Sequence, residues 1–131
     1  MSVEWVATNT VLAMHKRQIA EHGGTDGLRD EGLLLSALAR PENLEAYGEN
    51  VDLAALAASY AFGITKNHPF LDGNKRTALV VAVTFLNLNG YDFDAPSQET
   101  YTMFLQLAEG SLTEDDLGAW FRERLYEIKS R

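Results

Sequence analysis

Residues 53–90 read LAALAASYAFGITKNHPFLDGNKRTALVVAVTFLNLNG, two apolar stretches on either side of a short polar one. The first, residues 53–66, is rich in Ala and Leu and follows Asp52, a good helix cap. The second, residues 74–89, has a β-branched middle that could form a strand, but its polar start and its length of about four turns favour a helix. We therefore expect two buried helices, joined by the loop 67–73, to form a central hairpin.

Two helices are expected before this hairpin. Ser2 can cap a first helix that continues to about His22, where the turn-rich sequence GGTDG follows. Asp30 can cap a second helix, which is expected to end before Pro41 because the residue that precedes a proline is restricted away from helical geometry. A polar loop is then expected over residues 42–51.

Two more helices are expected after the hairpin. Ser97 can cap one that stops at Gly110. Thr113, with Asp116 in the capping-box position, can cap another that runs to the C-terminus. The sequence therefore predicts one all-α domain over residues 1–131, with about six helices arranged around the central apolar hairpin.

The composition limits the class of protein. With 131 residues, 46% of them apolar, the chain can fold as one globular domain. It has no cysteine, which excludes disulfides, thiol catalysis and thiolate metal sites and suits a reducing cytoplasm. Its first residues lack a basic and apolar leader, so we expect no signal peptide and a cytoplasmic protein. The net charge of −8 argues against direct binding to nucleic acid or to an anionic membrane.

The few cations around the hairpin loop are unevenly placed. Within residues 41–121 the only Lys or Arg side chains are Lys66, Lys75 and Arg76, whereas the same stretch holds twelve carboxylates. A solvated helix face would mix the two signs of charge more evenly. The three cations, together with the nearby His68, therefore predict a local site for an anion.

The loop that starts this cluster has a predictable shape. Residues 68–76 read HPFLDGNKR. Pro69 is expected to hold His68 in an extended conformation. Phe70 is an apolar residue in a polar loop, so it is expected to anchor the loop to the core.

The helix that follows the loop begins with unfavourable charges. Gly73 permits a left-handed turn and close approach of another molecule, and Asn74 is a good cap. Lys75 and Arg76 then stand in the first turn, where the helix dipole favours acids. Unpaired N–H groups, a glycine turn and two cations are together typical of a phosphate-binding site. A bound polyphosphate would turn this penalty into a stabilising interaction.

Two side chains beside this helix start could carry chemistry. Histidine changes protonation near neutral pH, so His68 could accept a proton from an attacking hydroxyl. Asp72 could hold Mg²⁺, which typically takes one or two protein carboxylates together with phosphate oxygens. The alternative is structural: Asp72 as a turn residue and the Lys–Arg pair as solvated charges. A purely structural role is the expectation for His15 and His22, and it is equally open for Lys66.

The sequence HPFLDGNKR resembles the signature of the Fic/Doc (Fido) family, H-x-F-x-(D/E)-(G/A)-N-(G/K)-R. Lysine after the asparagine, followed by TAL, resembles the Doc branch, the death-on-curing toxins of bacterial toxin–antitoxin pairs. Residues 19–41 resemble the amino-terminal half of that branch, and FLNLNGY at residues 85–91 the end of its central helix.

The resemblance implies an all-α Fido fold that modifies a protein hydroxyl with ATP. It implies His68 as the base and Asp72 as the Mg²⁺ ligand. It also implies that the residues after Asp72 contact phosphates: Gly73, Asn74, Lys75 and Arg76. Lys66, the basic residue before the motif, is a further candidate for a phosphate contact.

Three activities remain open at this point. The Doc branch transfers the γ-phosphate of ATP to a threonine of elongation factor Tu, which arrests translation. Fic proteins that transfer AMP instead read G-N-G-R-x-x-R, from which this chain departs at Lys75 and Leu79. Gly73, at a position where Doc has alanine, keeps the Fic-like adenylyltransferase chemistry open. The third reading is a non-catalytic protein-binding domain.

Inhibition is expected to come from another chain. Some Fic proteins carry an inhibitory helix with the pattern (S/T)-x-x-x-E-(G/N), and here Glu109–Gly110 has Leu105 at the Ser/Thr position. We therefore expect a separate antitoxin, of which a short segment folds into a groove on this domain.

Overall fold

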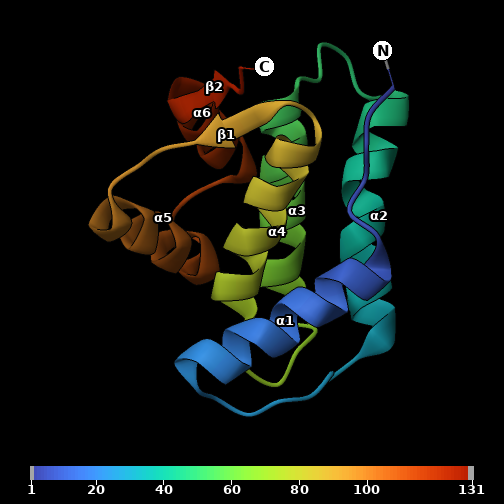
Figure 1. The fold of residues 1–131 in the computed structure, drawn as a ribbon. Coiled ribbons are helices and arrows are strands. Elements are labelled where there is room, and N and C mark those ends of the chain that lie inside the picture. Colours follow the sequence, from blue (N-terminus) through green and yellow to red (C-terminus); the bar gives the residue numbers. More distant parts are fainter. Residues whose placement is uncertain (1, 130–131) are drawn as a thin grey trace.

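The computed structural model describes residues 2–129 and is almost entirely helical (Figure 1). Its elements are α1 (Thr8–His22), α2 (Glu31–Tyr47), α3 (Leu53–Asn67), α4 (Asn74–Leu88), β1 (Tyr91–Phe93), α5 (Ser97–Glu109), α6 (Glu114–Arg124) and β2 (Leu125–Glu127). The all-α prediction, with about six helices, is confirmed.

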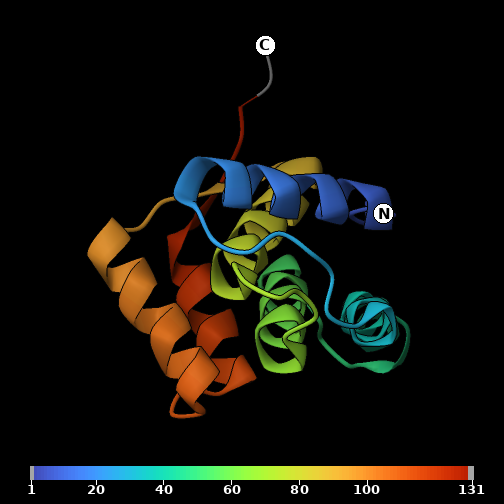
Figure 2. The same cartoon turned by 90° about the horizontal axis from the view of Figure 1, so that it is seen from below.

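The hairpin of α3 and α4 occupies the centre of the molecule. Helix α3 packs against α2, α4 and α6, while α1 crosses α4 and α5 lies against α4 and α6. Figure 2 shows α2 on one side of the hairpin and the α5–α6 pair on the other, with α1 lying across. The predicted central position of the two apolar helices is therefore confirmed.

Helix α3 is held in the centre by the burial of its side chains. Asp52 caps it, since its carboxylate accepts a hydrogen bond from the Ala55 N–H at 2.9 Å. Ten of its fifteen residues are buried, among them Tyr60 and Ile64. Burying one large apolar side chain contributes about 1.5–3 kcal/mol, so a helix covered on most sides is held mainly by packing.

The first helix begins later than the sequence predicts. It starts at Thr8 rather than after Ser2, and the preceding segment is not helical. Long-range bonds hold that segment: Glu4 and the Asn89 side chain exchange two hydrogen bonds of 2.9 Å, and the Val6 N–H donates to the Tyr60 hydroxyl at 3.1 Å. These bonds keep the segment before Thr8 non-helical, although Ser2 could cap a helix.

The second helix continues through its proline. The predicted end before Pro41 is wrong, because α2 extends to Tyr47 with Pro41 buried inside it, and most of the polar loop predicted over 42–51 is helical. A helical proline loses one backbone bond. Close packing of α2 on α3 offsets this cost: a Cβ added to Gly63 would lie 3.2 Å from the Cα of Ala37.

The caps of the last two helices follow the sequence in part. Gly110 ends α5 in the left-handed conformation, at φ 87°. Thr113 and Asp116 form the predicted capping box. Ser97, however, is the first residue of α5 and makes no side-chain cap bond, because Pro96 takes the cap position.

A small sheet was not predicted. Helix α6 ends at Arg124 instead of running to the C-terminus, and the chain continues as β2, which pairs with β1 in antiparallel register. The pairing joins Phe93 to Leu125 and Tyr91 to Glu127. Among the described residues, no helix is both long and apolar enough to cross a bilayer.

Candidate active site

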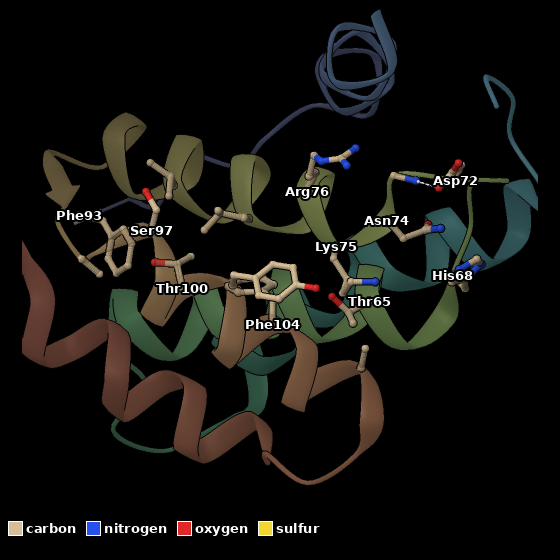
Figure 3. Close-up of a pocket in the computed structure, with 16 residues that line it drawn as sticks. Thr65, His68, Asp72, Asn74, Lys75, Arg76, Phe93, Ser97, Thr100 and Phe104 are labelled. Atoms are coloured by element: carbon tan, nitrogen blue, oxygen red, sulfur yellow. Dashed lines mark hydrogen bonds between the residues drawn. The ribbon is translucent and has the colours of Figure 1, made fainter. Parts of the chain in front are cut away.

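A cavity of about 530 Å³ opens beside the start of α4 (Figure 3). One end is lined by the predicted motif residues His68, Asp72, Gly73, Asn74, Lys75 and Arg76. All of these except Gly73 are labelled in the right half of Figure 3. The rest of the cavity wall comes mainly from α4, β1 and α5 and is largely apolar, with Leu79, Val83, Phe93, Ala95, Phe104 and Ala108. Six of the seven predicted site residues therefore meet at one cavity.

Asn74 fastens the loop from inside the helix. Its side chain accepts a hydrogen bond from the Phe70 N–H at 3.0 Å and donates one to the Phe70 carbonyl, also at 3.0 Å. The predicted cap role of Asn74 is wrong, because Gly73 takes the cap position in the left-handed conformation, at φ 75°. Phe70 is fully buried, as predicted for an anchor. The side-chain amide of Asn74 is thus bonded to the loop. Only the backbone N–H of Asn74 remains to contact a ligand.

His68 ends α3 in a left-handed conformation, with φ 52° and ψ 55°. The predicted extended backbone is therefore wrong. Its own N–H bonds to the Ile64 carbonyl at 3.1 Å and closes the helix. The Arg29 guanidinium donates to the His68 carbonyl at 2.7 Å and to the Asn67 carbonyl at 2.8 Å. Left-handed non-glycine residues cost about 1–3 kcal/mol and persist only where surrounding contacts hold them.

Residues ahead of α2 brace the loop from outside. The backbone N–H groups of Arg29 and Asp30 both donate to the Pro69 carbonyl, at 2.7 and 3.0 Å. The Leu71 N–H donates to the Gly27 carbonyl at 3.0 Å. This short backbone pairing fixes the path of the chain between His68 and α4.

His15 supports the same loop from the core. It is buried, its ring stacks on Phe70 with 3.8 Å between centroids, and its Nε2 donates to the Asp72 carbonyl at 2.8 Å. The carbonyl can only accept, so Nε2 carries the proton. The expectation of a structural role for His15 agrees with this position.

Asp72 keeps an ionised carboxylate at the cavity. The backbone N–H groups of Gly73 and Thr25 donate to it at 2.8 and 3.3 Å, and these bonds hold the pKa of Asp72 below its ordinary value. Gly24 allows this close approach, because a Cβ there would lie 2.7 Å from Asp72 Oδ2. One exposed carboxylate on the cavity wall suits a metal that takes its remaining ligands from phosphate and water. Across residues 2–129 no cluster of three His, Asp or Glu side chains could hold a metal alone.

The first turn of α4 has unpaired donors and unpaired charge. Lys75 and Arg76 are exposed, and neither forms an ion pair with any residue in the described part of the chain. The turn contains no acidic residue. The first N–H to bond back along the helix is that of Thr77, to the Gly73 carbonyl at 3.0 Å, so the three N–H groups before it have no helical acceptor. This end of the cavity can therefore hold a polyphosphate.

Lys66 does not line the cavity. Its ammonium lies 6.0 Å from the centroid of the Phe62 ring, and a Cβ on Gly110 would be 3.6 Å from it. Gly110 follows the last turn of α5, where a cation complements the helix dipole. Of the two roles left open for Lys66, this position fits the structural one.

The contacts that three residues make with this loop were missed from the sequence: those of Arg29, His15 and Thr25. Each acts on the loop from at least 38 positions away along the chain. Nothing in their immediate sequence marks them, since an arginine before an aspartate or a histidine within a helix is common. The α5 side of the cavity was also missed, because it depends on how α5 packs beside α4.

Comparison with known proteins shows the family of the chain. The Fic/DOC family profile matches residues 5–86. The chain is 33% identical to protein kinase doc of Escherichia phage P1 over 109 residues. This aligned stretch covers 82% of this chain and 86% of that protein. The chain is 41% identical over 85 residues to toxin Doc of Mycolicibacterium smegmatis, covering 59% of this chain and 63% of that protein. The chain belongs to the Fic/DOC family, and these relatives place it in the Doc branch.

Proposed function

We propose that this chain is a Doc-like toxin that transfers the γ-phosphate of ATP to a protein hydroxyl. The acceptor we propose is a threonine of elongation factor Tu, so that the reaction stops translation and arrests growth. The observation that carries the proposal is the start of α4, where two exposed cations without ion pairs among the described residues face the same cavity as His68. Both named relatives support a toxin or kinase of this kind.

The composition of the cavity wall favours phosphate transfer over AMP transfer. Lys75 stands where the adenylylating motif has its second glycine, and its ammonium can neutralise a phosphate at the helix start. Leu79, one turn further along α4, stands where that motif has its last arginine, and it contributes an apolar surface to the cavity. The positive charge is thus concentrated at one end of the cavity.

The residues would act mainly by positioning and by charge. The N–H groups of the first α4 turn, with Lys75 and Arg76, hold the phosphate chain and offset the charge of the transferring group. His68 takes the proton of the acceptor hydroxyl as its oxygen bonds to the γ-phosphorus, while the bond from that phosphorus to the bridging oxygen breaks and ADP leaves. Asp72 would hold Mg²⁺, which supplies further charge neutralisation on the phosphates.

A separate antitoxin is proposed as the inhibitor. The cavity is open, and its wall exposes apolar side chains, including Leu79 and Phe93, that a short folded segment could cover. Such a segment would block the acceptor protein and the nucleotide together. The proposal predicts that growth arrest by this chain is relieved by co-expression of its antitoxin.

Labelled ATP tests the reaction type. Purified elongation factor Tu is incubated with the protein, Mg²⁺ and ATP carrying the label on either the γ- or the α-phosphate. We expect label on elongation factor Tu from the γ-position and none from the α-position. The reverse pattern would establish an adenylyltransferase. Absence of both labels, combined with normal growth on expression, would favour a non-catalytic binding domain.

A further inference from the structure

Thr65 places a hydroxyl without a partner on the cavity wall. It lies in the last turn of α3 and is 6% exposed. Its Oγ1 is closed off from water and has no hydrogen-bond partner in the described structure. In Figure 3 the Thr65 hydroxyl points toward the side of the cavity on which the Lys75 ammonium ends.

The Thr65 hydroxyl also makes no bond to its own helix. A helical threonine can turn its hydroxyl to the carbonyl four residues earlier, here that of Ala61. Thr100 and Thr102 of α5 do this, at 3.0 Å each, but Thr65 does not. A buried hydroxyl left unpaired lowers the stability of the fold. In a cavity that gathers other ligand-binding groups, such a cost marks a group held ready for a ligand.

We propose that the Thr65 hydroxyl donates a hydrogen bond to a phosphate oxygen of the bound nucleotide. This inference rests on the proposed function, because it assumes that the triphosphate lies at the start of α4. A phosphate oxygen held by Lys75 can only accept, which matches a hydroxyl donor. Lys75 lines the same cavity as Thr65 and is exposed, so its side chain can move when a ligand enters.

The test compares Thr65→Val with Thr65→Ser. Valine keeps the shape and removes the hydroxyl, whereas serine keeps the hydroxyl. We expect the Kd for a non-hydrolysable ATP analogue with Mg²⁺, measured by calorimetry, to rise about 10-fold or more in T65V, as for a lost bond to a charged group. T65S is expected to stay within about 3-fold of the unmodified protein. The Tm of T65V is expected to be unchanged or higher, because no protein bond is lost.

Thr77→Val provides a matched control. Thr77 also carries a buried hydroxyl without a partner, but it is fully buried and does not line the cavity. T77V should therefore leave the Kd unchanged. If T65V fails to fold, Thr65→Ala removes the same hydroxyl with less side-chain bulk and replaces it in the comparison.

The outcomes separate this inference from the proposed function. If the unmodified protein binds the analogue and T65V binds it equally well, Thr65 makes no phosphate contact, and the proposed function still stands. If T65V loses affinity for the analogue but not for inorganic tripolyphosphate, the hydroxyl contacts the nucleoside and the phosphate assignment is wrong. If the unmodified protein binds neither compound, the proposed function fails, and this inference fails with it.

Discussion

Replacing Arg29 should slow the reaction without weakening nucleotide binding. Its guanidinium bonds to the carbonyls of Asn67 and His68 at 2.8 and 2.7 Å, yet Arg29 does not line the cavity. Arg29→Met removes both bonds and keeps most of the aliphatic side chain. We expect His68 to leave its left-handed conformation more often in this variant.

The size of the effect follows from two opposing terms. A hydrogen bond from a charged donor contributes about 1.5–3 kcal/mol when buried. Because Arg29 is exposed, water replaces part of this, and about 1–2 kcal/mol for the pair is a fair expectation. The left-handed backbone of His68 costs a similar amount, about 1–3 kcal/mol. Each 1.36 kcal/mol changes a rate about tenfold, so kcat should fall roughly 5- to 30-fold.

The assay is steady-state transfer of label from γ-labelled ATP to elongation factor Tu. In Arg29→Met, kcat should fall while the KM for ATP stays within about 3-fold, as expected when only the reactive geometry is lost. Arg29→Lys should recover part of the rate, since an ammonium can reach one carbonyl. Arg17→Met is the control, because Arg17 is also exposed and its side chain bonds to Glu21 on its own helix.

Two results would refute this reasoning. An unchanged kcat in Arg29→Met would show that the guanidinium does not hold His68 in its working position. A KM that rises as much as kcat falls, with a matching loss in calorimetric affinity, would show that Arg29 acts on nucleotide binding instead.

Three further predictions concern charge. Lys75→Glu should raise the Kd for the ATP analogue about 10-fold or more, whereas Lys129→Glu, outside the cavity, should leave calorimetric affinity unchanged. Asp72→Asn should raise the Mg²⁺ concentration needed for half-maximal transfer, and an unaltered Mg²⁺ titration would contradict its role as ligand. The side-chain bond from Arg122 is the main cause that lowers the pKa of Asp52, so this pair stabilises the fold above about pH 4 and its contribution disappears as pH falls through the lowered value. Asparagine can still cap α3, so Asp52→Asn removes mainly the ion pair. The loss of stability, measured by urea unfolding, should be about 0.5–1 kcal/mol at pH 7 and should shrink toward pH 3. A loss that does not change with pH would contradict the assignment.

The parts of the fold that were predicted correctly depend on short-range signals. The Asp52 cap, the apolar run of α3 and the capping box at Thr113 and Asp116 lie within a few residues of the elements that they define. The wrong predictions involve competition with distant contacts. Pro41 remains helical because α2 packs closely on α3, and Ser2 caps nothing because residues after it bond to Asn89 and Tyr60.

The small sheet had almost no signal of its own. Each strand has three residues, and the two pair across about thirty positions of sequence. Phe93 alternates with polar neighbours, but a run this short cannot be distinguished from a loop by its pattern. The strands were therefore predictable only from the packing that brings the chain after α4 beside the chain after α6.

The candidate site was predictable because its main residues form one contiguous segment. His68 and the first turn of α4 are brought together by the short loop itself, which the sequence signals of Gly73 and Phe70 describe well. The conformation of His68 was not predictable, because the Arg29 side chain that bonds to its carbonyl comes from a distant part of the sequence. Thr65 gave no signal, since only the packed cavity shows that its hydroxyl lacks a partner.

The central claim is that the start of α4 holds the triphosphate while His68 takes the proton of the acceptor hydroxyl. Its most direct test is His68→Ala, with calorimetric binding of the ATP analogue and single-turnover transfer of γ-label measured on the same preparation. The account predicts nearly unchanged binding and a transfer rate lowered by about 10²–10⁴. Transfer at the unmodified rate, or loss of binding in step with the loss of rate, would contradict it.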